Sequence, residues 1–149
     1  MRYILSVCIG VLFLNGCVVL ESGQETVKTI WGSSTRALEN ERVHAQVKTY
    51  SFSYWEVFKA AKRVIEQQGY VLFKSDDIRG VMIVMGVPQT VNTTEIGIFF
   101  VEEGERQTRI EVTSLSTNAK RLLSKTLFEG LDIAFGLAQP KPIAPTANP

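Results

Sequence analysis

The sequence predicts an α+β domain in which an antiparallel sheet of about five strands is covered by two helices. Residues 53–69 and 117–136 carry apolar side chains at helical spacing, and the segments between them are β-branched or alternate between apolar and polar residues. A helix with one apolar stripe must bury it, and an antiparallel sheet offers an apolar face for that purpose. The predicted element order is strand, helix, four strands, helix.

The first part of this domain combines a short helix with a strand. Residues 34–42 have a helix-favouring composition but few large apolar side chains, which predicts a short, weakly amphipathic helix. From Val43 onward the pattern is strict alternation, with Ala45 and Val47 on one side and polar residues between them. This period of two predicts a half-buried strand that runs to about Phe52, with the valines facing the core.

The clearest helix follows at residues 53–69. Ser53 and Glu56 form a capping box, in which two side chains bind backbone N–H groups left free at the start of a helix. Gly69 supplies the left-handed residue that ends such a helix. Apolar residues recur between them at steps of three and four and form one stripe: Val57, Phe58, Ala61, Val64 and Ile65.

The other four strands have different patterns, which predict different burial. Residues 80–87 are almost wholly apolar, which is typical of a central strand covered on both faces or of a strand at a protected edge. In the last strand Ile110 and Val112 are expected to face the core, while Glu111 and Thr113 face solvent. The four strands are predicted at residues 70–74, 80–87, 95–102 and 108–115, joined by a polar turn at 75–77, a loop at 87–94 and a tight turn at 103–104.

A second helix is predicted to close the domain. It begins near Thr117, carries its leucines on one side, and ends at Gly136. Gly130 lies inside it, where glycine costs about 1 kcal/mol relative to alanine. We therefore expect a close approach to the sheet at that residue. The proline-rich residues 138–149 lack the apolar mass needed to fold and are predicted to be an extended, disordered tail.

The most specific motif of the chain lies at its N-terminus. Arg2 gives a positive start, residues 4–14 form an apolar run, and Leu14-Asn15-Gly16-Cys17 closes that run. The run is shorter than the roughly 20 residues that a membrane-spanning helix needs, so a removable signal is expected. Its closing motif resembles the lipobox of bacterial lipoproteins.

This resemblance implies a lipid anchor. In lipoproteins the cysteine, here Cys17, becomes the first residue of the mature chain and carries a diacylglycerol and an amino-terminal acyl group, and two or more acyl chains anchor a protein stably. In Gram-negative lipoproteins an aspartate after the cysteine commonly retains the protein at the inner membrane. Val18 stands there in this chain, which implies the periplasmic face of the outer membrane. The expected organisation is a cleaved signal at 1–16, a lipidated tether at 17–33, the α+β domain at 34–137 and the tail.

Charge and cysteine content exclude several functional classes. The chain has 16 basic and 15 acidic residues, and the signal contains one of the basic ones, Arg2, so the mature domain is expected to be nearly neutral. Such a balance argues against a nucleic-acid binder, which normally carries a basic excess. Cys8 would leave with the signal and Cys17 would carry the lipid. A thiolate metal site, an internal disulfide and a cysteine nucleophile are therefore not expected.

The sequence contains no motif that combines residues into a catalytic, cofactor or metal site. His44 is the only histidine and is expected on the solvent side of its strand, without a second ligand. The acidic clusters, Asp76-Asp77 and Glu102-Glu103-x-Glu105, fall at predicted hairpin tips, where solvated carboxylates are typical. We therefore predict a protein that is not an enzyme and that binds neither a metal nor a cofactor.

The predicted element order resembles that of a helix-grip or related two-layer α+β domain. It is similar to the order in the domains of the accessory lipoprotein of the outer-membrane β-barrel assembly machinery, and the expected cellular address is the same. This resemblance concerns element order and address, and it implies the two-layer architecture already expected from the apolar patterns.

Two segments are candidates for binding a partner. The loop at 87–94, which includes Val91, Asn92 and Thr93, lies between apolar strands that would hold it rigidly; the alternative is a plain connector. Trp31 stands in the polar tether, where it either anchors a partner or packs back onto the domain. The leading hypothesis is a binding or scaffold domain for another cell-envelope protein. The alternative is a carrier of a small apolar ligand or lipid, held between helix and sheet.

Overall fold

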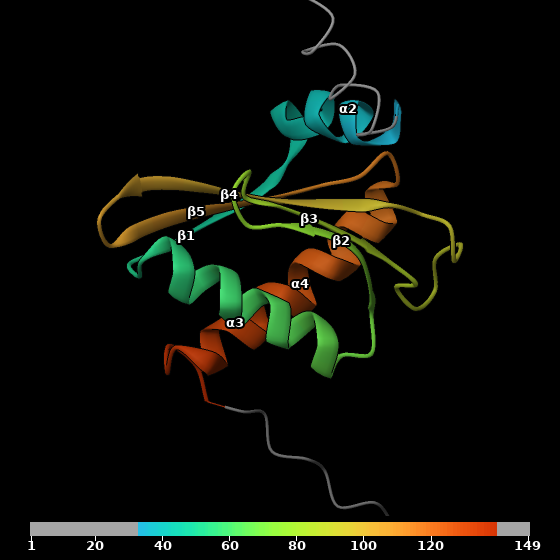
Figure 1. Cartoon of the computed structure of the whole chain (residues 1–149). Helices are drawn as coiled ribbons and strands as arrows, with labels where there is room; N and C mark the ends of the chain where they lie inside the picture. Colours follow the sequence, from blue (N-terminus) through green and yellow to red (C-terminus); the bar gives the residue numbers. More distant parts are fainter. Residues whose placement is uncertain (1–32, 140–149) are drawn as a thin grey trace, which may run out of the picture. The chain divides into compact units, whose positions relative to one another are not determined.

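The computed structural model describes residues 33–139, and these form a five-stranded antiparallel sheet with helices on both of its faces (Figure 1). The strand order is β1-β5-β4-β3-β2, so β1 and β2 are the two edges. The predicted α+β class and the order strand, helix, four strands, helix are confirmed. In chain order the elements are α2 (Ser33–Asn40), the 3-10 helix η1 (Glu41–His44), β1 (Gln46–Tyr50), α3 (Tyr54–Gln67), β2 (Val71–Asp76), β3 (Val81–Met85), β4 (Ile96–Gly104), β5 (Gln107–Thr113) and α4 (Thr117–Ala134).

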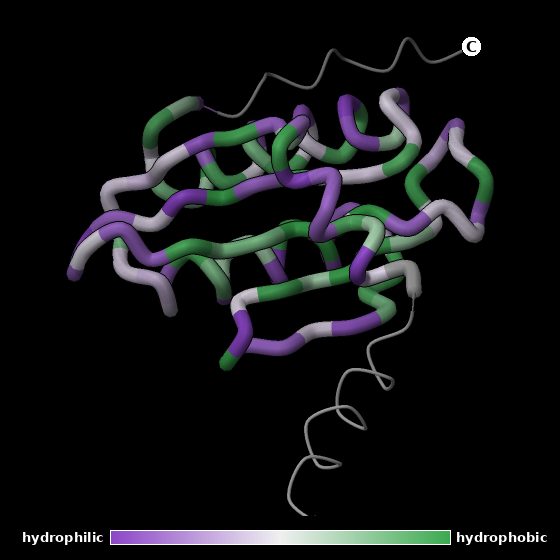
Figure 2. Tube along the Cα trace, turned by 90° about the horizontal axis from the view of Figure 1, so that it is seen from above, coloured by the Kyte–Doolittle hydropathy of each residue, from purple (hydrophilic) through white to green (hydrophobic). Residues whose placement is uncertain are grey.

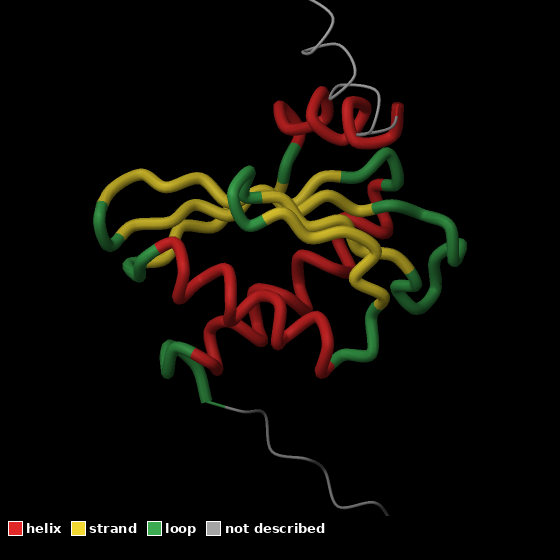
Figure 3. Tube along the Cα trace, viewed as in Figure 1, coloured by secondary structure: helices red, strands yellow, loops and turns green. Residues whose placement is uncertain are grey.

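Helices α3 and α4 cover one face of the sheet, here called the inner face (Figures 1 and 3). Both helices turn their apolar stripes to the strands, as their spacing predicts. Strand β3 is buried on both faces, in agreement with its continuous apolar sequence. The inner core contains Val57, Ala61 and Ile65 of α3, Leu123, Leu127 and Leu131 of α4, and Met82, Val84, Ile96, Ile98, Phe100, Ile110 and Val112 of the sheet.

The ends of both long helices follow the local sequence signals. At the start of α3 the Ser53 backbone N–H donates to the Glu56 carboxylate at 3.0 Å, and the Ser53 hydroxyl donates to it at 2.6 Å. Gly69 has a φ of +71° and ends the helix in the left-handed conformation that a glycine adopts without strain. At the start of α4 the Ser116 hydroxyl accepts the backbone N–H of Ala119 at 3.3 Å.

The alternation around β1 is real, but the predicted side of burial is wrong. Val43 lies in η1 and is 82% exposed, and Val47 pairs with Glu111 on the face opposite the core. Tyr50 points inward instead and is buried. Its large ring packs at 5.6 Å from that of Phe135, and its hydroxyl lies 3.3 Å from both the Phe128 carbonyl and the Asp132 carboxylate. A tyrosine with polar partners gains more from burial than a small valine does.

Gly130 marks a close approach, but to α3 rather than to the sheet. A Cβ atom at this position would lie 2.5 Å from Cγ1 of Val64, a distance that bonded neighbours alone can reach. The glycine therefore lets α3 and α4 cross closely over the sheet. The prediction that Gly130 approaches the sheet is therefore wrong, because its close neighbour is Val64 of α3.

The outer face of the sheet is covered by α2 and η1 (Figure 1). Leu38 of α2 is buried and lies against Gly97, where a Cβ atom would be 3.4 Å from the Leu38 Cβ. The Arg42 guanidinium of η1 lies 4.8 Å from the centre of the Phe99 ring, and its Nε lies 2.6 Å from the Glu111 carboxylate. Glu111 and Thr113 do point away from the core, but both are buried, so the expectation that they face solvent is wrong.

Candidate binding surface at the uncharged end of the sheet

The connections between strands and helices gather at two opposite ends of the sheet (Figure 3). One end carries the β2–β3 turn and the β4–β5 hairpin; the hairpin tip is hydrophilic, whereas the turn combines hydrophilic residues with one exposed apolar residue (Figure 2). The other end carries the α3–β2 turn, the β3–β4 loop and the β5–α4 connection. Residues 67–73, 86–94 and 113–119 form most of these three connections and contain no charged side chain, and Glu95 follows at the end of the β3–β4 loop. We call this region the uncharged end.

The β3–β4 loop consists of two consecutive tight turns. The backbone N–H of Thr90 donates to the Val87 carbonyl at 3.2 Å and its hydroxyl donates to the same oxygen at 2.7 Å. The Thr94 N–H then donates to the Val91 carbonyl at 2.8 Å. Within the first turn Gln89 has a φ of +66°, which costs a residue with a side chain about 1 kcal/mol or more. The loop therefore holds one defined shape at the expense of backbone strain.

The ends of this loop are attached to the body of the domain. Val87 is buried in the core, and Pro88 follows it. At the other end of the loop the Ser114 hydroxyl of the β5–α4 connection donates to the Glu95 carbonyl at 2.9 Å. These contacts hold the β3–β4 loop to the sheet and to the β5–α4 connection.

The structure brings some of the predicted binding residues to this surface. Val91, Asn92 and Thr93 are all exposed, with 71% of Val91 open to solvent. Cys17 and Trp31 lie outside the described residues. The sequence analysis did not single out Leu115, which is 73% exposed in the β5–α4 connection, or Val71, which is exposed at the start of β2. In the sequence, Leu115 and Val71 are marked only by lying in stretches that contain no charged residue. The three stretches are recognised as one surface only when the fold places them at the same end of the sheet.

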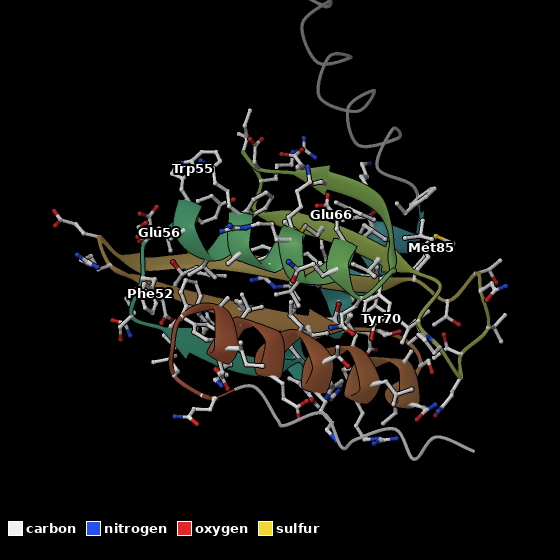
Figure 4. All side chains as sticks on the ribbon, turned by 90° about the horizontal axis from the view of Figure 1, so that it is seen from below. Phe52, Trp55, Glu56, Glu66, Tyr70 and Met85 are labelled. Carbon is white, nitrogen blue, oxygen red and sulfur yellow. The ribbon has the colours of Figure 1, made fainter. Side chains whose placement is uncertain are left out.

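Aromatic and sulfur-containing side chains border the same end. Tyr70 and Met85 lie near the C-terminal end of α3, close to Glu66, whereas Phe52, Trp55 and Glu56 lie at the opposite end of that helix (Figure 4). Tyr70 and Met85 are half-buried. The surface thus combines apolar side chains with hydroxyl and amide groups, the latter from Gln89, Asn92, Thr93, Ser116 and Asn118.

Several buried or half-buried polar groups elsewhere have structural partners. The Lys48 ammonium binds the Asp132 carboxylate at 2.6 Å, which joins edge strand β1 to α4. Burial and the neighbouring Asp132 raise the pKa of the Tyr50 phenol, so the phenol stays protonated and donates its hydrogen bonds. The Lys120 ammonium donates to the His44 carbonyl at 2.7 Å, while the His44 side chain is exposed, as predicted. These contacts tie η1 and β1 to α4.

Within residues 33–139, no three side chains of His, Cys, Asp or Glu are grouped as a metal ion would require. Over the same residues, no helix has the length and apolar character to cross a membrane. No known protein-family model matches the chain, and a search of curated proteins gives no match either. The function of the protein is therefore inferred from the sequence motif at the N-terminus and from the surface of the described domain.

Proposed function

We propose that this protein is a lipoprotein anchored to the periplasmic face of the outer membrane through Cys17, and that its domain binds another cell-envelope protein without catalysing a reaction. The lipobox motif at residues 14–17 supports the anchor. The uncharged end supports the binding role, and it is the one observation on which that role depends. Trp31, next to the domain in sequence, stays a candidate second contact.

The composition of the uncharged end fits a protein interface. The cores of such interfaces are distinguished from the remaining surface chiefly by their lack of charged residues. Val91 and Leu115 offer apolar side chains that a partner would cover, and the surrounding hydroxyl and amide groups can form hydrogen bonds at the rim. Because the β3–β4 loop is already ordered, binding would lose little conformational entropy there.

The packing of the interior favours binding at the surface over carriage of an apolar ligand. A carrier would need an apolar cavity of several hundred cubic ångströms between helices and sheet. In this domain the space between them is occupied by buried side chains of both layers, including Phe58, Phe100 and Leu127. The crossing of α3 and α4 is so close that Gly130 has no room for a Cβ atom. These features support the binding or scaffold role.

The anchor is tested by intact-mass analysis of the protein purified from the membrane fraction. We expect a chain that starts at residue 17 and carries fatty acyl groups, and we expect Cys17→Ser to leave the membrane fraction. A mature chain that starts elsewhere, or that has no acyl group at Cys17, would contradict the lipoprotein assignment. This result does not depend on the binding surface.

The binding surface is tested by cross-linking in intact cells followed by quantitative recovery of the partner. Val91→Glu and Leu115→Glu place a charge at the uncharged end, and each should reduce recovery at least tenfold. Val43→Glu is the matched control, since Val43 is an equally exposed valine on η1. Trp31→Ala tests the tether separately. Unchanged recovery with both charged variants would rule out the uncharged end as the contact surface.

A further inference from the structure

The opposite end of the sheet carries a second exposed apolar surface, formed by Trp55, Tyr54 and Ile78. We propose that this indole surface binds a lysine- or arginine-rich extended segment of a partner protein. The proposal rests on observations that are independent of the uncharged end and of the membrane anchor. The exposed Trp55 is the main contact residue, and the negative charge near it favours a positively charged partner.

Trp55 is held in place by aromatic neighbours while one side of it stays open. Its ring lies edge-on to Tyr54, with 5.4 Å between the ring centres, and edge-on to Phe58, at 6.4 Å. It is nevertheless 51% exposed, at the end of α3 that begins the helix (Figure 4). A tryptophan held this way loses little freedom on binding, and tryptophan is enriched among the residues that dominate interface energies.

The β2–β3 turn lies beside this tryptophan. The Tyr54 hydroxyl donates to the Asp77 carbonyl, which joins the first turn of α3 to the turn. Ile78, the next residue, is 94% exposed. Gly80 closes the turn so tightly that a Cβ atom there would lie 2.6 Å from the Phe100 carbonyl oxygen. The turn is therefore fixed to the sheet and to α3, and it carries the exposed Ile78 one residue after the carbonyl that Tyr54 binds.

Three carboxylates lie close enough to Tyr54, at the edge of the indole surface, to act on its phenol. Burial raises the pKa of the Tyr54 phenol, and the negative charges of Asp77, Asp76 and Glu102 raise it further, so these three carboxylates act on Tyr54 from two neighbouring hairpins. Residues 54–59, 76–80 and 102–109 together contain six acidic and four basic side chains: Glu56, Asp76, Asp77, Glu102, Glu103 and Glu105 against Lys59, Arg79, Arg106 and Arg109. At the other end of the sheet, residues 67–73, 86–94 and 113–119 contain no charged side chain.

This combination selects for a cationic partner. A guanidinium or ammonium group is attracted to the face of an indole and at the same time to nearby carboxylates. The same chemistry occurs within the domain, where Arg42 lies over Phe99 at 4.8 Å and Lys48 lies 5.2 Å from the Tyr50 ring centre. A localised negative field also speeds the approach of a basic partner. An acidic or neutral segment would gain neither contribution.

The test uses the full mature chain in neutral detergent with Trp31→Phe, which leaves Trp55 as its only tryptophan. A synthetic peptide of alternating arginine and serine should change the Trp55 fluorescence with a saturable dependence on concentration, and raising the salt concentration should weaken it. A matched peptide with glutamate in place of arginine should have no effect. Equal responses to both peptides, or no response to either, would overturn the proposal.

Two variants locate the binding by calorimetry. The double variant Asp76→Asn/Asp77→Asn keeps the side-chain shapes and should weaken the arginine peptide at least tenfold. Glu66→Gln/Glu129→Gln removes two exposed carboxylates elsewhere on α3 and α4 and should change binding less than threefold. Equal losses in both variants would mean general charge attraction and would overturn the site. A Trp55 signal that instead depends on protein concentration would identify a second copy of this chain as the occupant, which also contradicts the proposal.

Discussion

The inner face of the sheet is closed by two long helices through apolar side chains, whereas the outer face is closed by one short helix and a group of ion pairs. On the inner side α3 and α4 bury leucine, valine and phenylalanine side chains against the strands. On the outer side α2 has eight residues and contributes Leu38, while Arg42 and Arg109 hold the buried Glu111. An isolated helix shorter than about 12 residues is marginal in water, so α2 depends on the sheet for its own stability.

This difference indicates that the two sides contribute unequally to folding. The inner layer makes the sheet a stable scaffold that presents rigid surfaces at both of its ends. The outer cover is smaller and is joined to the sheet by contacts that salt and local opening can weaken.

The largest effect is expected from Leu127→Ala in the inner core. The variant should lower the free energy of unfolding by about 2–5 kcal/mol, because it removes apolar contacts and leaves a cavity between α4 and the sheet. The matched change on the outer side is Leu38→Ala, which should mainly release α2. Urea denaturation measures the global loss, and hydrogen exchange shows whether α2 amides alone become unprotected. Equal global losses for the two variants would contradict the comparison.

A smaller effect is expected from Glu111→Gln. The change removes the negative charge that two arginines share and should lower the free energy of unfolding by about 1–2 kcal/mol. The loss stays this small because both arginine side chains are partly exposed and regain water. The difference from the unaltered protein should shrink as salt is added. Glu103→Gln, which removes the exposed partner of Arg109 at 2.7 Å, is the control and should cost less than about 0.5 kcal/mol. A stability loss at Glu111 that is independent of salt would indicate a packing role instead.

The crossing of α3 and α4 is tested with a double-mutant cycle. In Gly130→Ala the higher helix propensity of alanine should stabilise the protein by about 1 kcal/mol, but the added Cβ atom forces the helices apart, which costs about 1–3 kcal/mol. We therefore expect the free energy of unfolding to fall by about 1 kcal/mol. In a Val64→Ala background the same change should be neutral or stabilising. Thermal denaturation of the four proteins gives the coupling energy. Additive effects would show that the two side chains do not compete for the same space.

The smallest effect concerns the capping box of α3. Hydrogen bonds from the Ser53 side chain and backbone lower the pKa of Glu56 below its ordinary value, with a further contribution from Arg106. A lowered folded-state pKa stabilises the protein above the unfolded-state pKa, and this stabilisation is lost as the pH falls through the folded-state value. The melting temperature of Glu56→Gln should thus lie below that of the unaltered protein at neutral pH and converge with it in acid. Glu129→Gln is the control, and a gap that persists in acid would contradict the mechanism.

Several features of the fold were predictable because they depend on neighbouring residues. The capping box, Gly69 and the apolar stripe of α3 all lie within one helix, and the structure places them as expected. The continuous apolar run of β3 indicated burial on both faces for the same reason. The β3–β4 connection was also recognisable as a loop, and its Val91 is exposed.

Other features depend on residues far away in the chain and could not be predicted. The sequence around β1 alternates in either phase, and the choice of Tyr50 over Val47 as the inward residue depends on Phe135 and Asp132 of the C-terminal region. Gly130 signalled a close contact, but Val64 was identified as its partner only by the packing of the two helices. Leu115 and Val91 share a surface only because β4 and β5 bring their connections to the same end.

From its sequence alone, this chain determined which segments become helices and strands and where the long helices end, because propensity, capping and periodicity act within a few residues. The motif at residues 14–17, which resembles a lipobox, likewise belongs to the sequence itself and supports the proposed address. Only the tertiary structure decided that Glu111 is buried beneath η1, that α3 and α4 meet at Gly130, and that charge separates to one end of the sheet. These outcomes depend on contacts between residues far apart in the sequence, because the burial of a strand residue depends on which helix covers that face of the sheet.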